Sequence, residues 1–261
     1  MIIGISGKLN SGKDTIAQMI QYLDDFKRYK YTHLISLTDF KSWEASEHPQ
    51  HSKWKIKKFA GKLKDIVCLL IGCTREQLED REFKEKPLGE KWKLYRAWKG
   101  GIDTGDYEEV ILPLDTDILL KYEDIQEEIL TPRKLMQLLG TKCGREILHP
   151  NIWSNALFAD YNKKWIDSKS GFAKKELPKW IISDVRFPNE AQVIKDRNGI
   201  LIRINRTTNN SLINNDIHAV TNWQHPSETS LDSYDNWDYV VENDGSLEDL
   251  LNKVRKIYEK I

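Results

Sequence analysis

Two glycines and a lysine near the start of the chain, Gly7, Gly12 and Lys13, have the spacing of a phosphate-binding loop. Such a loop binds anions because its backbone N–H groups and those at the start of the following helix point at phosphate oxygens. The helix dipole adds positive potential. We expect both glycines to adopt positive φ angles, which glycine reaches at little cost, and Lys13 to lie across the outer phosphates. The alternative is an ordinary strand–turn–helix with a surface lysine.

The residues on either side of this loop predict the two elements that must hold it in place. An apolar run at residues 2–5 predicts a short buried strand, which Gly7 ends. After the loop, apolar residues recur at the spacing of one helix face. These residues are Ile16, Met19, Ile20 and Leu23. Because strand, loop, lysine and helix occur in this order, phosphate binding is the better interpretation.

Asp14 stands where the standard motif has a Ser or Thr that binds Mg²⁺, and Thr15 follows one position later. The hydroxyl that usually binds the metal is therefore displaced. An ending of the form Gly-Lys-x-Thr resembles P-loop kinases of nucleoside monophosphates more than motor or switch NTPases. Asp14, Thr15, water and a carboxylate later in the chain are the candidates to hold Mg²⁺.

Asp184 is that later carboxylate. It ends an apolar strand predicted at residues 180–184, and ligands of a parallel α/β sheet collect beyond the carboxyl ends of its strands. An aspartate there can hold Mg²⁺ directly or through water. Arg186 follows, and a helix is predicted to start at Pro188. Glu190 is therefore either a stabiliser of the first helical turn or a site residue.

Arginines in the middle of the chain indicate a second anion site. A helix is predicted over residues 131–140, with Thr131 as its N-cap and Gly140 as its end. Arg133 on this helix and Arg145 beyond it could each make forked, paired hydrogen bonds to a monophosphate, which lysine cannot copy.

A second basic helix is predicted between residues 57 and 72. Its start carries Lys62 and Lys64, which either receive a phosphate or form a solvated basic face. The predicted buried side consists of Leu63, Ile66, Val67, Leu70 and Ile71, and Gly72 is predicted to end the helix. Arg81 follows in a charged, partly helical stretch. The interpretation without a functional role is that Arg81 forms a surface ion pair.

The remaining pattern alternates strands with amphipathic helices. Further strands are predicted at residues 33–37, 199–204 and 239–243. Ser246 and Asp249 are predicted to cap a final helix as a capping box, and residues 47–51 and 207–236 are predicted to be loops. This alternation indicates an α/β fold, a three-layer α/β/α sandwich with a mostly parallel sheet.

The pattern weakens at residues 87–130, where strand-like segments are predicted at 95–98 and 110–114. We expect a lid, hairpin or small subdomain inserted there into a single domain that spans residues 1–261.

Composition limits the classes of function. Lys and Arg total 40 in 261 residues, as do Asp and Glu, so the formal net charge is zero. A general nucleic-acid binder needs a basic excess, so we expect small-molecule partners and no nucleic acid. Cys68, Cys73 and Cys143 lack metal-ligand spacing and indicate free thiols in a reducing cytosol. We expect no signal peptide and no membrane span.

Several segments together resemble the deoxynucleoside monophosphate kinases encoded by tailed bacteriophages. The most specific are Arg-Lys-Leu-Met-Gln-Leu-Leu-Gly-Thr from Arg133 and Asp-Val-Arg-Phe-Pro-Asn-Glu from Asp184. The resemblance covers residues 7–15, 59–65, 131–141 with Trp153, 184–191 and 243–251, and it does not extend closely to 24–54 or 87–130. It implies a P-loop kinase that transfers the γ-phosphoryl group of ATP, with Mg²⁺, to a deoxynucleoside monophosphate. It also implies a homodimer in the host cytoplasm.

The resemblance further implies which residues form the site. The residues implied to bind ATP are Lys8, Asn10, Ser11, Gly12, Lys13, Asp14 and Thr15. Those implied to bind the acceptor are Leu63, Lys64, Arg81, Arg133, Gly140, Thr141, Trp153 and Glu190, and Trp153 could stack on a base. The implied catalytic residues are Lys13, Arg133, Asp184 and Arg186, and the metal candidates are Asp14, Thr15 and Asp184.

Two alternatives remain open at this point. One is a P-loop kinase for another small acceptor, such as dephospho-coenzyme A, whose alcohol group needs a base that Asp14 could supply. The other is a nucleotide-binding regulator or packaging accessory that does not turn over. A panel of acceptors tested with ATP separates all three functions.

Overall fold

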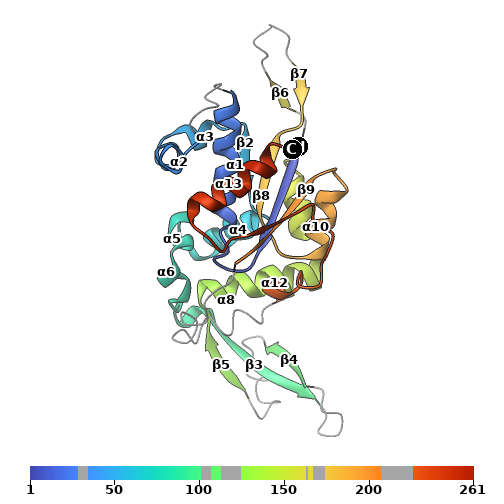
Figure 1. Ribbon diagram of the computed structural model, residues 1–261. Helices are drawn as coiled ribbons and strands as arrows, with labels where there is room; N and C mark the ends of the chain where they lie inside the picture. The colour runs from blue at the N-terminus through green and yellow to red at the C-terminus, as the bar shows by residue number, and fades with distance from the viewer. Residues whose placement is uncertain (29–34, 101–106, 113–124, 163, 167–173, 207–225) are drawn as a thin grey trace. The chain divides into compact units, whose positions relative to one another are not determined.

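The computed structural model describes residues 1–28, 35–100, 107–112, 125–162, 164–166, 174–206 and 226–261. The chain forms two compact units. The first consists of Met1–Gly61 and Trp153–Ile261, and the second of Lys62–Ile152. Figure 1 identifies the elements of both units by label and colour.

A five-stranded parallel sheet forms the centre of the first unit. Its strands are β1 (Ile2–Gly7), β2 (Trp54–Lys57), β8 (Lys179–Val185), β9 (Ile200–Asn205) and β10 (Tyr239–Glu242). Their spatial order is β10-β9-β1-β8-β2, and every neighbouring pair is parallel. In the central strand, Ile3 pairs with Ile181 on one side and with Ile200 on the other. Because β1 lies between two neighbours, both of its faces must be covered by helices.

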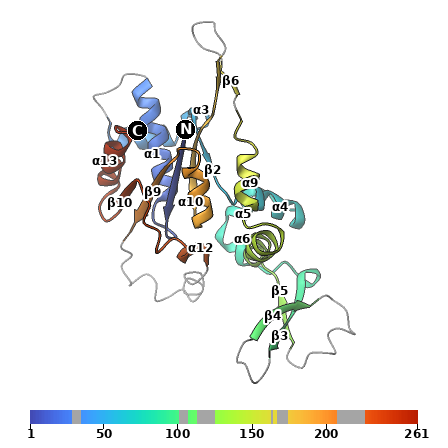
Figure 2. The ribbon, with the colours of Figure 1, turned by 90° about the vertical axis from the view of Figure 1, so that its right-hand side faces the viewer.

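Helices cover the two faces of this sheet (Figures 1 and 2). On one face lie α1 (Lys13–Arg28), α2 (Leu37–Glu44) and α13 (Leu247–Tyr258), and on the other lie α9 (Ile152–Phe158) and α10 (Pro188–Lys195). The unit also contains the short helices α3 (His48–His51) and α12 (Pro226–Thr229) and the strand pair β6 (Lys164–Ile166) and β7 (Lys174–Glu176). The predicted three-layer α/β/α fold is confirmed.

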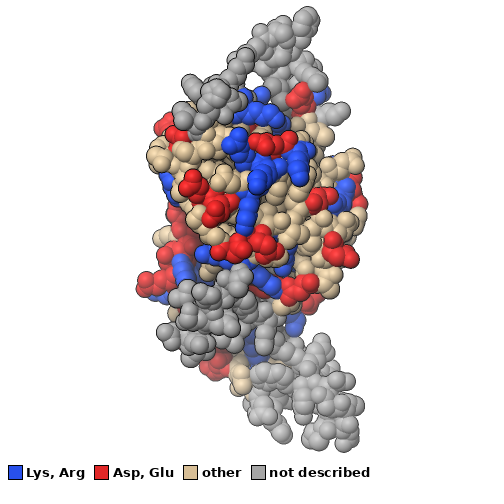
Figure 3. All heavy atoms as spheres, viewed as in Figure 1, with Lys and Arg blue, Asp and Glu red and all other residues tan. Residues whose placement is uncertain are grey.

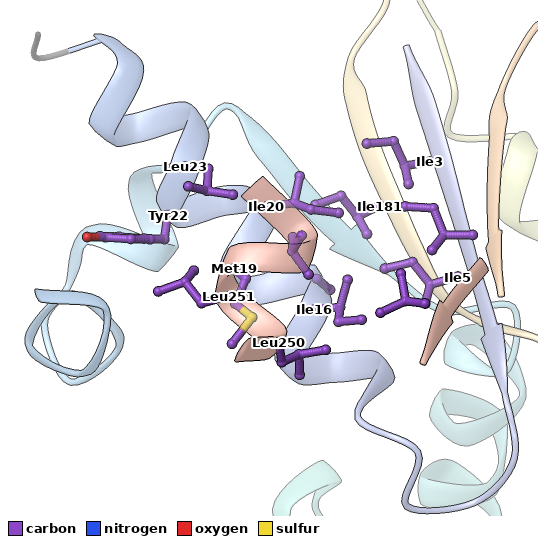
Figure 4. Close-up of a cluster of buried hydrophobic side chains, with 14 of the residues drawn as sticks. Ile3, Ile5, Ile16, Met19, Ile20, Tyr22, Leu23, Ile181, Leu250 and Leu251 are labelled. Atoms are coloured by element: carbon purple, nitrogen blue, oxygen red, sulfur yellow. The ribbon is translucent and has the colours of Figure 1, made fainter. Parts of the chain in front are cut away.

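The core beneath α1 fixes the position of this helix on the sheet. Ile16, Met19 and Ile20 are buried against Ile3 and Ile5 of β1, which explains their helical spacing in the sequence. Figure 4 shows Leu250 and Leu251 of α13 in the same cluster. Burying such a side chain contributes roughly 1.5–3 kcal/mol, so the start of α1 is held firmly against β1.

The second unit combines short helices with a three-stranded antiparallel sheet. Its helices are α4 (Gly61–Ile71), α5 (Arg75–Glu79), α6 (Arg81–Glu85), the 3₁₀ helix η1 (Glu90–Trp92), α8 (Pro132–Gln137) and the π-helix η2 (Leu138–Leu148). Its strands β3 (Lys93–Gly100), β4 (Tyr107–Leu112) and β5 (Gln126–Ile129) have the order β4-β3-β5. The strands predicted at 95–98 and 110–114 correspond to β3 and β4, although residues 113–114 lie outside the described residues.

Several predicted boundaries agree with the structure. Ser246 and Asp249 form the predicted capping box of α13, and the Thr131 side chain accepts the N–H of Lys134 at the start of α8. Gly72 follows the end of α4 with a φ of +66°. The three cysteines are free thiols, and the Sγ atoms of Cys68 and Cys73 are 3.8 Å apart. No helix among the described residues is long and apolar enough to cross a membrane.

Two local predictions between α1 and β2 were wrong. No strand contains residues 35–37, because the Ser36 side chain accepts the N–H of Asp39 and starts α2 at Leu37. Residues 33–34 lie outside the described part. The predicted loop at residues 47–51 contains α3, whose first turn accommodates Pro49 because proline is tolerated there. Part of the loop predicted at 207–236 is likewise helical, in α12, while residues 207–225 lie outside the description.

Two predictions about the second unit were also wrong. Leu63 and Val67 of α4 are buried as expected, but Ile66 and Leu70 are 39% and 51% exposed and Ile71 is half-buried. Gly140 does not end a helix, because the backbone continues into the π-helix η2. A Cβ atom on Gly140 would lie 2.8 Å from Cδ2 of Leu63, so glycine at this position allows close packing.

Candidate active site

The loop between β1 and α1 has the backbone that anion binding requires. We call residues 7–13 the phosphate loop. Gly12 has a φ of +100° and Asn10 a φ of +60°, and the N–H of Ser11 donates to the carbonyl of Lys8 at 3.2 Å. Gly7 does not adopt the positive φ that we expected. Its Cβ would lie 2.4 Å from Oγ of Ser11, so close approach of the loop, and not backbone conformation, requires glycine there.

Side chains from the C-terminal part of the unit hold the phosphate loop in this shape. Asn243, just after β10, donates through Nδ2 to the carbonyl of Ser11 at 2.9 Å. Arg206, just after β9, donates to the carbonyl of Asn10 at 3.0 Å. These bonds occupy loop carbonyls, so they stabilise the curl of the loop.

Lys13 is the first residue of α1, and its side chain folds back over the loop. Its Nζ donates to the carbonyls of Gly7 at 2.8 Å and Lys8 at 2.6 Å. Burial and the nearby charge of Arg186 lower the pKa of Lys13 to about 8, against the opposing effect of Glu228. The structure therefore holds a partly desolvated cation at the mouth of the loop, where an anion would stabilise it.

Glu228 on α12 brings a carboxylate to this loop. Its Oε2 accepts the backbone N–H of Leu9 at 2.9 Å, and its Oε1 accepts a hydrogen bond from Arg186. Lys8 donates to the backbone carbonyl of Glu228 and pairs with Asp232. A loop N–H and an arginine thus already bind an anionic oxygen pair beside Lys13. This is the donor set that a phosphate group needs.

Asp14 is exposed on the second residue of α1. Its Oδ1 accepts the hydroxyl of Ser183 at 2.6 Å, and its Oδ2 pairs with Nζ of Lys58 at 3.0 Å. Burial opposes ionisation, but the Ser183 hydrogen bond and the Lys58 charge outweigh it and lower the pKa of Asp14. Asp14 is therefore ionised at neutral pH and is a weak proton acceptor, which does not favour the alternative with an alcohol acceptor.

Asp184 is buried at the end of β8, and both of its oxygens are hydrogen-bonded to backbone. Oδ1 accepts the N–H of Phe59 at 2.7 Å, and Oδ2 accepts the N–H of Ala60 at 3.0 Å. Burial raises the pKa of Asp184, and these two bonds act against that rise. Asp184 thereby ties the segment after β2 to β8.

Arg186 and Glu190 are connected at the start of α10. Oε2 of Glu190 accepts the backbone N–H groups of Arg186 at 2.8 Å and Phe187 at 3.1 Å, and the Glu190 side chain is 1% exposed. Two roles were predicted for Glu190, and these bonds correspond to the first of them, stabilisation of the first helical turn. The cap fixes the backbone from which Arg186 reaches Glu228.

The second unit contains a separate group of cations. Nζ of Lys64 on α4 lies 2.6 Å and 2.7 Å from the two carboxylate oxygens of Glu79, and Arg133 on α8 pairs with Glu85. The side chains of Lys64 and Arg133 are 15% and 30% exposed. Two of the predicted acceptor-binding cations thus lie at the junction of α4, α5, α6 and α8.

A comparison of the sequence with protein families decides the assignment. The sequence model of the deoxynucleotide monophosphate kinase family matches residues 104–254, which is more than half of the chain. The chain belongs to the deoxynucleotide monophosphate kinase family. It is a kinase that phosphorylates deoxynucleoside monophosphates, as the resemblance implied.

Individual relatives in this kinase family are similar over most of their length. The chain is 25% identical to the deoxynucleoside-5'-monophosphate kinase of Escherichia phage T5, over 88% of this chain and 85% of that protein. It is 27% identical to the deoxynucleotide monophosphate kinase of Escherichia phage RB69, over 98% of both chains. A putative deoxynucleotide monophosphate kinase of Acanthamoeba polyphaga mimivirus is 32% identical over 48% of this chain and 59% of its own.

The other residues predicted for the kinase site have varied surroundings. Thr141 and Arg145 lie half-buried on η2, and Arg81 is exposed at the start of α6. Trp153, on α9 of the first unit, is 4% exposed. Thr15 is half-buried on α1. Their roles in binding nucleotide or metal stay predictions.

Sequence reasoning missed three residues that contact the predicted kinase site. Glu228 lies in a polar stretch without periodicity, so nothing in the sequence connected it to the phosphate loop. Lys58 was visible only as one of several clustered lysines, and Ser183 only as the residue before Asp184. In all three cases the contact joins segments that are far apart in the chain.

Charges on the face drawn in Figure 3 are mixed, with Lys and Arg interspersed among Asp and Glu. Within the described residues, no group of three or more His, Cys, Asp or Glu side chains is arranged to hold a metal ion.

Proposed function

We propose that this kinase uses ATP as phosphoryl donor and binds its phosphates at the phosphate loop. The observation that supports this best is the group of donors around the Glu228 carboxylate. The N–H of Leu9 and the guanidinium of Arg186 both donate to it, and Lys13 is near enough for Glu228 to affect its pKa. A triphosphate presents anionic oxygens that fit the same donors.

Positioning and charge neutralisation would supply most of the catalysis. A monophosphate acceptor is already ionised at neutral pH, so phosphoryl transfer to it needs no strong general base. We propose that Lys13 and Arg186 neutralise charge that develops on the transferred group. The cap formed by Glu190 then serves to orient Arg186.

We propose that Mg²⁺ enters with the nucleotide and is held mainly by phosphates and water. The residues fit this role because Asp14 is ionised and exposed at the start of α1, with Thr15 beside it. Asp184 would contribute through water, since both of its oxygens already accept backbone N–H groups. Mg²⁺ in nucleotide enzymes commonly keeps several waters and only one or two protein ligands. When bound, it would neutralise phosphate charge.

We propose that the phosphate of the acceptor binds Lys64 and Arg133 in the second unit. Arg133 can offer two parallel N–H groups to a phosphate, and Lys64 can add a point charge.

We also propose that the chain is a single domain with an insertion near residues 87–130 and that it forms a homodimer. We propose that its partners are nucleotides and not nucleic acids, and that it is located in the host cytoplasm.

The first experiment is an acceptor panel. dGMP, dTMP, dCMP, modified dCMP and AMP are each incubated with ATP and Mg²⁺, and ADP formation is measured.

A variant of Lys13 tests the donor site. Lys13→Ala should lower turnover by at least about 100-fold, the range seen when one oxyanion-stabilising donor is removed. Thermal unfolding of the variant checks that the fold is intact. Turnover within a few-fold of the parent would refute the proposed donor site.

Arg133→Ala tests the acceptor side. It should mainly raise the KM for the monophosphate, with a smaller effect on the KM for ATP, because Arg133 is proposed to bind only the acceptor. A loss of kcat with an unchanged acceptor KM would contradict this role.

A further inference from the structure

Lys84 lies beside the two predicted acceptor-binding cations but was not singled out by the sequence. It is on α6, and its Nζ donates to the backbone carbonyl of Glu79 at 2.9 Å. The same Nζ lies 3.9 Å from Oε2 of Glu79, whose carboxylate is bound by Lys64. The Lys84 side chain is only 16% exposed, although lysines on short surface helices are usually well solvated.

The surroundings of Lys84 are those of an anion site. Burial, and then the charge of Lys64, lower the pKa of Lys84, and Arg133 acts in the same direction, against the opposing charges of Glu79 and Asp80. Cations are thus held close together despite their repulsion. Such an arrangement is stabilised when a strong anion binds among them.

The charges around Lys84 match the acceptor group. Lys64, Lys84 and Arg133 carry three positive charges, and the carboxylates of Glu79 and Glu85 that pair with them carry two negative ones. Glu79 also pairs with Arg75, whose charge is balanced by its second partner, Asp65. A phosphate monoester carries about −1.5 to −2 charges at pH 7. If the Glu79 carboxylate turns away, the surplus of positive charge at this group becomes equal to the charge of the monoester. Glu79 is 48% exposed, so it can turn into solvent.

We propose that Lys84 binds the phosphate of the acceptor together with Lys64 and Arg133, and that this phosphate displaces the Glu79 carboxylate. The inference rests on the proposed acceptor site and adds to it a third cation and a competing internal anion. Lys84 also donates to the last carbonyl of α5, so a purely structural role as a helix cap is the alternative to be tested.

Lys84→Met tests the binding role, because it keeps the apolar stem and removes the charge. We expect the KM for the monophosphate to rise about tenfold, the KM for ATP to stay within about twofold, and the unfolding temperature to change little. Direct titration of the free enzyme with the monophosphate alone should show the same loss of affinity. Lys84→Arg, which restores the charge, should recover most of it.

Lys86→Met is the matched control. Lys86 lies two residues after Lys84, directly after the end of α6, is exposed, and carries the same charge, so its variant should leave the KM for the monophosphate unchanged. If Lys84→Met and Lys86→Met behave alike, or if Lys84→Met lowers the unfolding temperature without changing acceptor affinity, the binding role is overturned.

Glu79→Gln tests displacement. Removing the carboxylate should increase the affinity for the monophosphate by about threefold or more, because one competitor for Lys64 and Lys84 disappears. Weaker binding would show that Glu79 only holds the lysines in place, and would overturn this part.

The outcomes are distinguishable from failure of the proposed acceptor site. If Arg133→Ala leaves acceptor affinity intact, the proposed site itself is wrong. If Arg133→Ala weakens acceptor binding and Lys84→Met does not, only the role of Lys84 is wrong.

Discussion

The carboxylate of Glu228 accepts the backbone N–H of Leu9 at 2.9 Å, and through its other oxygen it binds Arg186. The two residues are separated by most of the chain, yet this bond places an acidic side chain on the phosphate loop. An incoming nucleotide would need the same N–H and the same guanidinium. If the donor phosphates bind this loop as proposed, Glu228 competes with them, and its side chain leaves before they bind.

The first prediction concerns this competition. Glu228→Gln should lower the dissociation constant for ADP with Mg²⁺ about tenfold, equivalent to about 1.4 kcal/mol. The neutral amide binds Arg186 less strongly and does not repel the phosphates. Isothermal titration calorimetry measures the change.

Asp232→Asn is the matched control for that variant. It removes one negative charge from the same segment, but Asp232 pairs with the side chains of Lys8 and Arg203, whereas Glu228 accepts the loop N–H of Leu9. Its effect on ADP affinity should be smaller. If Glu228→Gln binds ADP more weakly than the parent, the carboxylate of Glu228 promotes nucleotide binding, and the predicted competition is wrong.

The second prediction is a pH dependence caused by Lys13. Its pKa in the folded protein, about 8, lies below the 10.5 of an ordinary lysine side chain. The ammonium group is therefore retained at pH 7 and lost as pH rises through 8. Nucleotide binding needs the charged form, so the dissociation constant for ADP should rise about fivefold between pH 8 and pH 9. In Lys13→Met this rise should be absent, and a parent protein with constant affinity up to pH 9.5 would contradict the assignment.

The same shift has a consequence for stability. Between pH 8 and 10.5, Lys13 binds a proton in the unfolded chain more than in the folded protein. The contribution of Lys13 to the free energy of unfolding therefore increases with pH in this window. The free energy of unfolding increases because loss of the proton from Lys13 removes the unfavourable burial of its charge in the folded protein.

The third prediction concerns the backbone of the phosphate loop. Gly12→Ala places a Cβ at a φ of +100°, 2.8 Å from Nδ2 of Asn243. We expect a loss of stability of at least about 1–2 kcal/mol, together with loss of ADP binding. Denaturant unfolding and titration measure the two effects.

Gly61→Ala is the control, because a Cβ there meets nothing within 4 Å and the backbone needs no positive φ. It should be neutral or slightly stabilising. Adding Asn243→Ala to Gly12→Ala should relieve only the contact. Complete recovery in this double variant would show that the backbone conformation itself is not strained.

The sequence predicted the fold well because periodicity reports local structure. Ile16, Met19 and Ile20 follow one face of α1, and the runs that became β8 and β9 are apolar because they lie in a buried sheet. The phosphate loop was predictable because a short sequence determines its conformation. Even there the reason for Gly7 was wrong, since Ser11 and the backbone of Ile204 limit its space.

The failures occurred where tertiary contacts decide. The sequence predicted that Gly140 ends a helix. In the structure Leu63 of another helix lies against Gly140, and the chain continues into a π-helix. Ile66 has the spacing of a buried residue on α4 and is nonetheless 39% exposed. Glu228 contacts the phosphate loop only because distant segments fold together, and no local pattern encodes that contact.

The central place of β1 has a consequence for how the chain acquires activity during synthesis. Ile3 pairs with Ile181 and Ile200, so the first strand leaves the ribosome long before either neighbour exists. Contacts between such distant segments form slowly and leave apolar surface exposed meanwhile. Until the neighbouring strands have been synthesised, the isoleucines of β1 lack the partners that bury them and are a natural target for chaperones. A nascent chain that ends before β9 would contain the whole phosphate loop but lack one of the two strands that pair with β1.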